Sequence, residues 1–295
     1  MDRKKLAEKV VSNIVGMLQK GDLPPWRSPQ FTGSIYPMNA VSKREYRGIN
    51  IWLLAGQAMV CEYSDNRWMT FRQAKECGGH VRKGEKSTPV VFWKIMKYED
   101  EHEDETKTVP LQRLYNVFNV QQTEGCDVGM AEDANPVNHN PISSAERIFN
   151  NMPNRPAVEY TNTTPSYSFT SDKVSLPHQG FWQNLEEYYH VLFHELSHST
   201  AHKTRLDRVQ DVLKLESKKS KQYAQEELVA EMSAAILSAN AGIRQSEVEN
   251  SASYIDTWLD ALKTNPDILV YAAQNAQKAS DFILGNESES TQSEI

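Results

Sequence analysis

The chain has 295 residues, of which 39% are hydrophobic and 24% are charged, a composition typical of a globular protein with a buried core. No run approaches the ~20 uninterrupted apolar residues of a membrane-spanning helix, so we expect no membrane partner. Three cysteines, none in a C-x-x-C spacing, argue against a disulfide framework and favour a reducing, cytoplasmic location.

The net charge of −7 hides an asymmetry along the chain. Up to Tyr98 there are 17 Lys and Arg against 8 Asp and Glu, whereas from Glu99 onward there are 15 against 31. The first third of the chain can therefore attract a polyanion although the whole protein is acidic.

The first part of the chain mixes helix and strand without a βαβ order, which predicts an α+β domain over residues 1–125. Apolar positions at helical spacing predict an amphipathic helix over the first 20 residues rather than a signal peptide. A second helix, with Asn50 as the expected N-cap, precedes a strand with a short helix and then a hairpin with a solvated tip. The predicted ranges are 48–63 for that helix, 67–79 for the strand and short helix, 88–98 and 111–120 for the hairpin strands, and 99–108 for the tip.

A linker rich in Asn, Pro, Asp and Gly predicts a domain boundary at residues 126–141. The second domain, residues 142–285, is expected to be mixed α+β as well, with short strands between helices. The predicted ranges are 143–152 for its first helix, 157–177 for the strands, and 184–202, 223–242, 253–265 and 268–285 for the later helices. The acidic, polar residues 286–295 predict a disordered tail.

One short motif indicates chemistry: His194-Glu195-Leu196-Ser197-His198. Residues four apart lie on one face of a helix, so His194 and His198 can present both imidazoles to one metal ion. Glu195 is offset by ~100° and is placed to act as general base on a metal-bound water. This is the H-E-x-x-H pattern of zinc peptidases. Zinc is the expected ion, with manganese as the alternative. The extended segment "DKVSLP" upstream is expected to be the edge strand that pairs with a peptide.

The third ligand has to come from another helix. His202 continues the spacing but lies ~12 Å along the axis from His194, too far to share an ion. In "EELVAEMSAA", Glu227 and Glu231 share a face and Glu226 does not. By analogy with the thermolysin-like Glu-x-x-x-Asp arrangement, we predict Glu227 as the ligand and Glu231 as the carboxylate that supports a ligand histidine, with the reverse assignment open.

Cations and aromatic residues alternate in the first third of the chain, which suits single-stranded DNA. Cations follow the phosphates while rings stack on unpaired bases, largely without regard to sequence. The same rings can instead form a core, which is favoured for Phe71, Phe92 and Trp52 and stays open for the other rings. The candidate DNA-binding residues are Arg47, Tyr46, Trp68, Arg72, Arg82, Lys83 and Lys86.

Both halves together resemble the plasmid-borne antirestriction proteins of the ArdC type. The resemblance spans about residues 5–245 and rests on words such as "YRGIN", "VVFWK", "FHELSHST" and "EELVAE", although Ala201 stands where the family often has Gly. It implies a single-stranded-DNA-binding domain joined to a zincin-like metallopeptidase domain, and a role in shielding incoming plasmid DNA from host restriction. Carried onto this chain, it implies His194, His198 and a glutamate of 226–231 as ligands, Glu195 as base, and Arg47, Arg82, Lys83 and Lys86 as DNA contacts.

Three functions are compatible with this sequence. The first is an antirestriction protein that coats single strands and carries a zinc-dependent, peptidase-like domain. The second is a regulatory metalloprotease that its front domain directs to DNA-bound protein substrates. In the third, the metal is structural and nothing is cleaved; however, a structural site has no need of Glu195.

Overall fold

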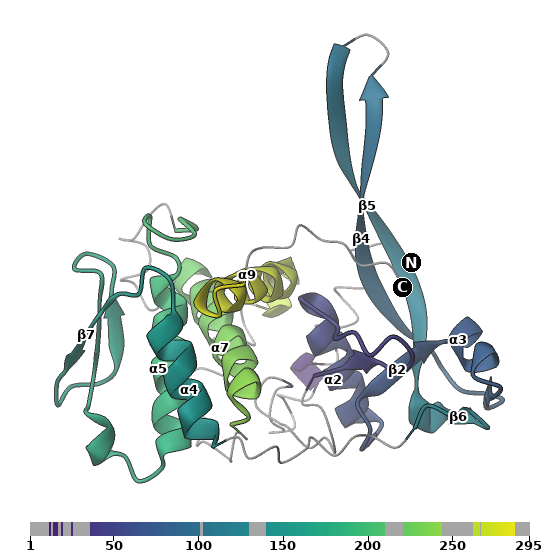
Figure 1. Ribbon diagram of the computed structural model, residues 1–295, viewed down its shortest axis with the longest axis horizontal. Coiled ribbons are helices and arrows are strands. Elements are labelled where there is room, and N and C mark those ends of the chain that lie inside the picture. Colours follow the sequence, from purple (N-terminus) through teal and green to yellow (C-terminus); the bar gives the residue numbers. More distant parts are fainter. Residues whose placement is uncertain are drawn as a thin grey trace. The chain divides into compact units, whose positions relative to one another are not determined.

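The computed structural model describes residues 36–100, 103–129, 140–209, 221–243, 262–265 and 267–286, with residues 12, 14–16, 19 and 25 near the N-terminus. The chain forms two compact units that divide between Asn135 and Pro136 (Figure 1). The few described residues near the N-terminus group with the second unit. The predicted domain extents, 1–125 and 142–285, stay predictions.

The first unit is built on a four-stranded sheet with the order β1-β2-β5-β4. Helix α2 packs against β4, and its apolar residues join those of the sheet in one core. Arg67 and Trp68 of β2 pair in parallel with β1, while β5 is antiparallel to both β2 and β4. The bounds are β1 Met38–Asn39, α2 Ile49–Val60, β2 Arg67–Thr70, β4 Thr88–Asp100 and β5 Glu103–Asn119.

A smaller sheet pairs two short strands, β3 (His80–Val81) and β6 (Thr123–Glu124). Strand β3 follows the short helix α3 (Phe71–Glu76), and β6 follows the single-turn helix η2 (Val120–Gln122). Thr70 begins α3 with a capping box: its side chain accepts from the backbone of Gln73, whose own side chain accepts from the backbone of Thr70. The strand and helix predicted within 67–79 are therefore present, with their junction at residue 70.

Two predictions for this unit are wrong. Asn50 is not an N-cap: Gly48 precedes α2 with φ +58°, while Asn50 is buried and bonds β4. Residues 99–108 are mostly strand rather than a loop, because β4 and β5 continue as a long two-stranded ribbon (Figure 1). Over those residues β4 and β5 pair only with each other. The many charged residues of this segment therefore did not rule out strand structure.

The described residues of the second unit include four α-helices and a three-stranded sheet. Helix α7 contacts α4, α5 and α9, and the sheet has the order β7-β9-β8 with β9 parallel to β7 and antiparallel to β8. Buried aromatic and aliphatic residues of α5 join residues of β9 and α7 in the core. The bounds are α4 Pro141–Asn151, β7 Ala157–Tyr160, β8 Ser166–Ser168, β9 Lys173–Leu176, η3 Gln179–Phe181, α5 Leu185–Ser199, α7 Lys221–Ala241 and α9 Asp267–Ile283.

The segment "DKVSLP" is extended as predicted, but it is not an edge strand. It contains β9, which lies between β7 and β8. The outer strand that bonds β9 in the antiparallel direction is β8. Most of the predicted helices over residues 1–20 and 253–265, and nearly all of the predicted tail 286–295, lie outside the described residues.

Candidate metal centre

Helix α5 carries the H-E-x-x-H motif in its last two turns. Asn184 caps the helix by accepting from the backbone N–H of Glu186 at 2.9 Å, and two acidic residues stand in its first turn. Tyr188, Leu192 and Leu196 are buried on the face that packs into the core. This packing fixes the rotation of the helix, and with it the direction in which its histidines point.

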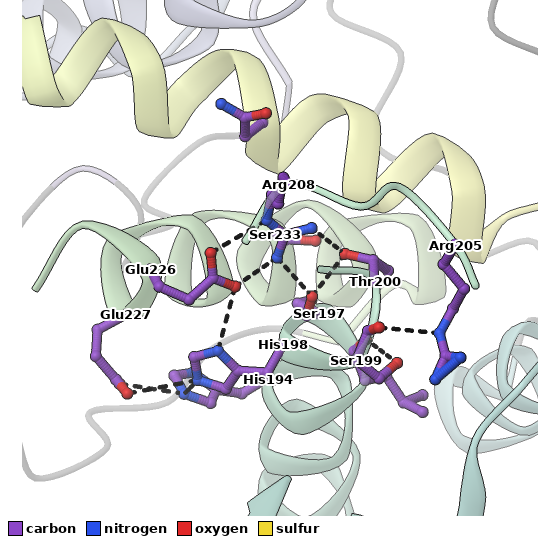
Figure 2. A network of polar contacts seen from close by, with 12 residues as sticks. His194, Ser197, His198, Ser199, Thr200, Arg205, Arg208, Glu226, Glu227 and Ser233 are labelled. Carbon is purple, nitrogen blue, oxygen red and sulfur yellow. Dashed lines mark hydrogen bonds and ion pairs between the residues drawn. The ribbon is translucent and has the colours of Figure 1, made fainter. Parts of the chain in front are cut away.

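Three side chains from two helices converge at one point (Figure 2). The Nε2 atoms of His194 and His198 lie 3.1 Å apart. Glu227 of α7 places its carboxylate oxygens 3.4 Å from Nε2 of His194 and 3.5 Å from Nε2 of His198. Among the described residues these three form one cluster whose donor atoms all lie within 4.8 Å of one another.

The spacing of these donors can be compared with a zinc site. Ligands about 2.0–2.1 Å from a tetrahedral zinc ion lie about 3.3 Å from each other. The two Nε2 atoms, 3.1 Å apart, and the distances of 3.4 and 3.5 Å from each of them to one or the other oxygen of Glu227 are close to that edge length. Two imidazoles and one carboxylate are also the donor types that zinc accepts, and they leave a fourth position for water or substrate. The residues present therefore fit a divalent metal ion.

Both histidines have a carboxylate against their second ring nitrogen. Glu231 places an oxygen 3.5 Å from Nδ1 of His194. Glu226 places an oxygen 3.4 Å from Nδ1 of His198. The sequence predicted Glu231 in such a position but set Glu226 aside, since it does not share the helical face of Glu227. The two ring nitrogens of His198 each face one of the neighbouring glutamates, Nδ1 facing Glu226 at 3.4 Å and Nε2 facing Glu227 at 3.5 Å.

The electrostatics of the cluster favour a cation. Burial lowers the pKa of His198, but the Glu227 and Glu226 carboxylates outweigh burial and raise that pKa well above its ordinary value. Burial raises the pKa of Glu227, but the two histidines outweigh it and hold that pKa well below its ordinary value. Positive charge is therefore stabilised at this point, as a metal site requires.

Glu195 is buried beside the cluster, with 7% of its surface exposed. Burial raises the pKa of its carboxyl, while the nearby His194 and His198 and a backbone hydrogen bond from Tyr167 of β8 act in the opposite direction. A carboxylate with a raised pKa is a better proton acceptor for water than an exposed one.

His202 takes no part in the cluster. Its Nδ1 lies 2.8 Å from the hydroxyl of Thr204 and 4.0 Å from the carboxylate of Asp172. Its place beyond the end of α5 agrees with its exclusion as a ligand. The same segment carries Arg205 and Arg208, whose buried side chains the sequence analysis gave no role. Their signal in the sequence was a pair of arginines, seven and ten residues after His198, within the stretch that carries the family resemblance.

The candidate DNA-binding residues of the first unit divide into two groups. Trp68 is fully buried and Tyr46 is 6% exposed, both within the core, so neither ring can stack on a base in this structure. The remaining candidates are all exposed: Arg47, Arg72, Arg82, Lys83 and Lys86. Conversely, Phe71, for which a core position was favoured, is 49% exposed.

Comparisons with known proteins cover both units. Residues 4–118 match the family described as the N-terminal domain of anti-restriction factor ArdC, and residues 143–275 match a zincin-like metallopeptidase family. Two Escherichia coli proteins named DNA primase TraC are 30% and 31% identical over 98% of this chain. The chain spans only 28% and 20% of the length of those primases.

Other relatives match this chain along almost their whole length. The uncharacterized protein y4eC of Sinorhizobium fredii is 30% identical, over 98% of this chain and 94% of its own length. Crystal structures of the antirestriction protein ArdC from plasmid R388 align with a TM-score of 0.72. The metal-free form is 32% identical and covers 95% of this chain and 97% of its own; the Mn(II)-bound form is 31% identical and covers 98% and 100%. This chain therefore belongs to the ArdC family of antirestriction proteins, with an ArdC-type N-terminal domain followed by a zincin-like metallopeptidase domain.

Proposed function

We propose that this protein binds single-stranded DNA, shields incoming plasmid DNA from host restriction, and holds one divalent metal ion in a peptidase-like site. The convergence of His194, His198 and Glu227 beside the buried Glu195 is the observation that carries the metal part. We assign these three as ligands, with zinc as the ion that the imidazoles favour and manganese as the alternative. Glu231, which faces Nδ1 of His194 rather than Nε2, is the supporting carboxylate.

When bound, the metal ion supplies Lewis acidity toward a carbonyl oxygen and toward an attacking water. The protein supplies the rest of the chemistry. The Glu195 carboxylate accepts the proton of the attacking water and delivers it to the leaving amine, as a general base and then a general acid. Burial of Glu195 supports this role, because it brings the pKa of the carboxyl closer to neutral pH.

The DNA-binding part of the proposal is supported by a basic turn of the first unit, residues 82–86, that is held by side-chain contacts. Arg82 and Glu85 form an ion pair at 2.7 Å. Gln122 donates to the Glu85 carboxylate at 2.9 Å and to the Lys86 carbonyl at 3.0 Å. The turn is therefore held by its own polar contacts while the side chains of Lys83 and Lys86 remain exposed. Exposed cations on a fixed turn suit contact with phosphates of any sequence.

A direct test of the turn is the double variant Lys83→Ala/Lys86→Ala. Each lost phosphate contact should remove about 0.7 from the slope of log affinity against log salt for single strands. Gel shifts or fluorescence anisotropy at several salt concentrations measure it. The matched control is Lys221→Ala/Lys278→Ala, which removes the same charge from exposed positions of the second unit. Equal salt slopes in both double variants would show that the turn does not contact DNA.

The second candidate function is a metalloprotease acting on DNA-bound proteins, and the buried Glu195 favours it over a structural metal. Glu195→Gln separates the candidates, because the variant keeps the size of the side chain but cannot accept the proton. Metal content by elemental analysis and single-strand affinity are expected to stay at wild-type values. Protection from restriction that persists in this variant would show that peptide cleavage is not needed for it. Loss of protection would favour the protease.

His194→Ala tests the metal site itself. We expect this variant to lose a stoichiometric ion that the wild-type protein carries or takes up. Unchanged ion content would contradict the ligand assignment, whatever happens to protection from restriction.

A further inference from the structure

Glu226 is a buried carboxylate that lies beside the metal cluster without joining it. It precedes Glu227 in α7, is 5% exposed, and faces Nδ1 of His198, the ring nitrogen turned away from the cluster (Figure 2). A buried carboxylate costs free energy unless it is paired and hydrogen-bonded. The residues that contact the Glu226 carboxylate therefore show how this cost is offset.

Arg208 is the main partner of Glu226. Its Nε lies 3.1 Å from one carboxylate oxygen and its Nη2 lies 2.5 Å from the other, a two-pronged pairing. Arg208 thus contacts both oxygens of Glu226, whereas Glu227 faces the two Nε2 atoms.

The same guanidinium also donates hydrogen bonds to the end of α5. Nη2 of Arg208 donates to the backbone carbonyl of Ser197 at 2.9 Å, and Nη1 donates to the hydroxyl of Thr200 (Figure 2). Ser197 directly precedes His198, and Glu226 directly precedes Glu227. One buried side chain thus connects the backbone next to a histidine of α5 with the residue next to the glutamate of α7.

We propose that Glu226 and Arg208 form a positioning pair for the metal site. Glu226 accepts the Nδ1 proton of His198, which fixes the tautomer whose Nε2 can bind a metal ion. Arg208 holds Glu226 in place and sets the spacing between the two helices that carry the donors. This inference rests on the proposed metal site and adds two residues that act on metal affinity without touching the ion.

The test measures metal affinity rather than activity. The variants are Arg208→Met and the milder Glu226→Gln, titrated with Zn²⁺ in competition with a chromogenic chelator. Loss of partners that orient a ligand histidine typically weakens metal binding about 10- to 100-fold, and we expect that range for Arg208→Met. The d–d absorption of Co²⁺ bound in place of zinc should also change, because it reports the ligand geometry.

Arg205→Met is the matched control. Arg205 is an equally buried arginine of the same segment, and it also bonds the end of α5, through the carbonyl of Ser199 at 2.9 Å. Its ion pair, however, is with Asp172 rather than with a carboxylate that contacts a ligand histidine. If the arginines only stabilise the fold, both variants should lower the thermal unfolding temperature and leave Zn²⁺ affinity and the Co²⁺ spectrum unchanged.

The outcomes separate this inference from the site on which it rests. The positioning pair is supported if Zn²⁺ binding is lost in His194→Ala, weakened in Arg208→Met and Glu226→Gln, and unchanged in Arg205→Met. Wild-type affinity in both Glu226→Gln and Arg208→Met overturns the pair while the site stands. If His194→Ala binds like wild type, the site itself is wrong and the pair falls with it. Should Arg208→Met fail to fold, Glu226→Gln decides alone.

Discussion

At the scale of single residues, Asn50 shows how one buried amide can join two elements. Its Nδ2 donates to the carbonyl of Val91 at 2.7 Å, and its Oδ1 accepts from the N–H of Val91 at 2.8 Å. Because β4 is the outer strand of the sheet, these groups of Val91 have no neighbouring strand on that side among the described residues. Asn50 therefore takes the place of a missing strand.

Asn50→Ala should remove both bonds and leave two buried backbone groups unpaired. We expect the free energy of unfolding to fall by about 2–4 kcal/mol, since each lost bond and each unpaired group costs about 1 kcal/mol or more. Urea denaturation measures the change. Gln57→Ala, on the same helix, is the control and should cost far less, because the Gln57 side chain bonds Cys61 at the end of its own helix. A loss below about 1 kcal/mol for Asn50→Ala would contradict this account.

The raised pKa of His198 also has a consequence for metal binding. At pH 7 the metal-free protein should hold a proton on this imidazole, because Glu227 and Glu226 outweigh the effect of burial. A metal ion must displace that proton, so its apparent affinity should rise with pH until the raised pKa is passed. Calorimetric titration in buffers of different ionisation enthalpy counts the protons released. Identical binding enthalpies in all buffers at pH 7 would show that none leaves.

At the scale of elements, the apolar stretches and their end signals were sufficient to predict α2, α5 and α7, but they did not locate every element boundary. The rings of Trp68 and Phe71 belong to one aromatic segment, yet the strand stops at Thr70 and α3 begins at Phe71. Trp68 therefore points into the core while Phe71, in the first turn of a helix, is half exposed. Residue types alone did not indicate which ring would be buried.

The candidate site shows the same limit. The spacing of the H-E-x-x-H motif brought His194 and His198 onto one face, and the predicted pair Glu227 and Glu231 does face them. Glu226 was missed because a helical wheel considers one face of one helix. Its contact with His198 depends on how α5 crosses α7, which is a property of packing and not of local sequence.

Phe71 is an exposed ring of the first unit, and under the proposed function we expect it to stack on an unpaired base. Lys75 lies 5.0 Å from its centroid and Phe118 packs beside it at 6.4 Å, so the ring stands beside a cation. Phe71→Ala should weaken single-strand binding by about 1–3 kcal/mol at constant salt. Fluorescence anisotropy measures this loss. Val60→Ala, which truncates another exposed apolar residue of the same unit, should leave the affinity unchanged; an equal effect in both variants would exclude stacking on Phe71.

At the scale of the whole molecule, the charge asymmetry and the division into two units are separate features, because the change from basic to acidic sequence at residues 98–99 lies within β4 of the first unit. The basic first third falls largely in the unit that carries the exposed Lys83 and Lys86, while the metal cluster belongs entirely to the other unit. Among the described residues, no helix is both long and apolar enough to cross a bilayer. The two proposed ligands, a polyanion and a divalent cation, thus have separate places in the chain.

If each unit unfolds on its own, a metal ion should stabilise only the second. An ion at 100 times its dissociation constant adds about 2.7 kcal/mol to the stability of the unit that binds it. For a unit of this size that amounts to a rise of about 5–10 °C in the unfolding temperature. Scanning calorimetry with Zn²⁺ and with a chelator should therefore show one transition that moves and one that does not.

The variants assign the transitions to the units. His194→Ala should abolish the metal-dependent shift of the second unit's unfolding transition. Asn50→Ala should lower the temperature of the other transition, which metal does not shift, because Asn50 lies in the first unit. Single-stranded DNA should raise that same transition. If metal instead moved both transitions together in the wild-type protein, the units would be energetically coupled, and an ion bound by the second unit could then alter DNA binding by the first.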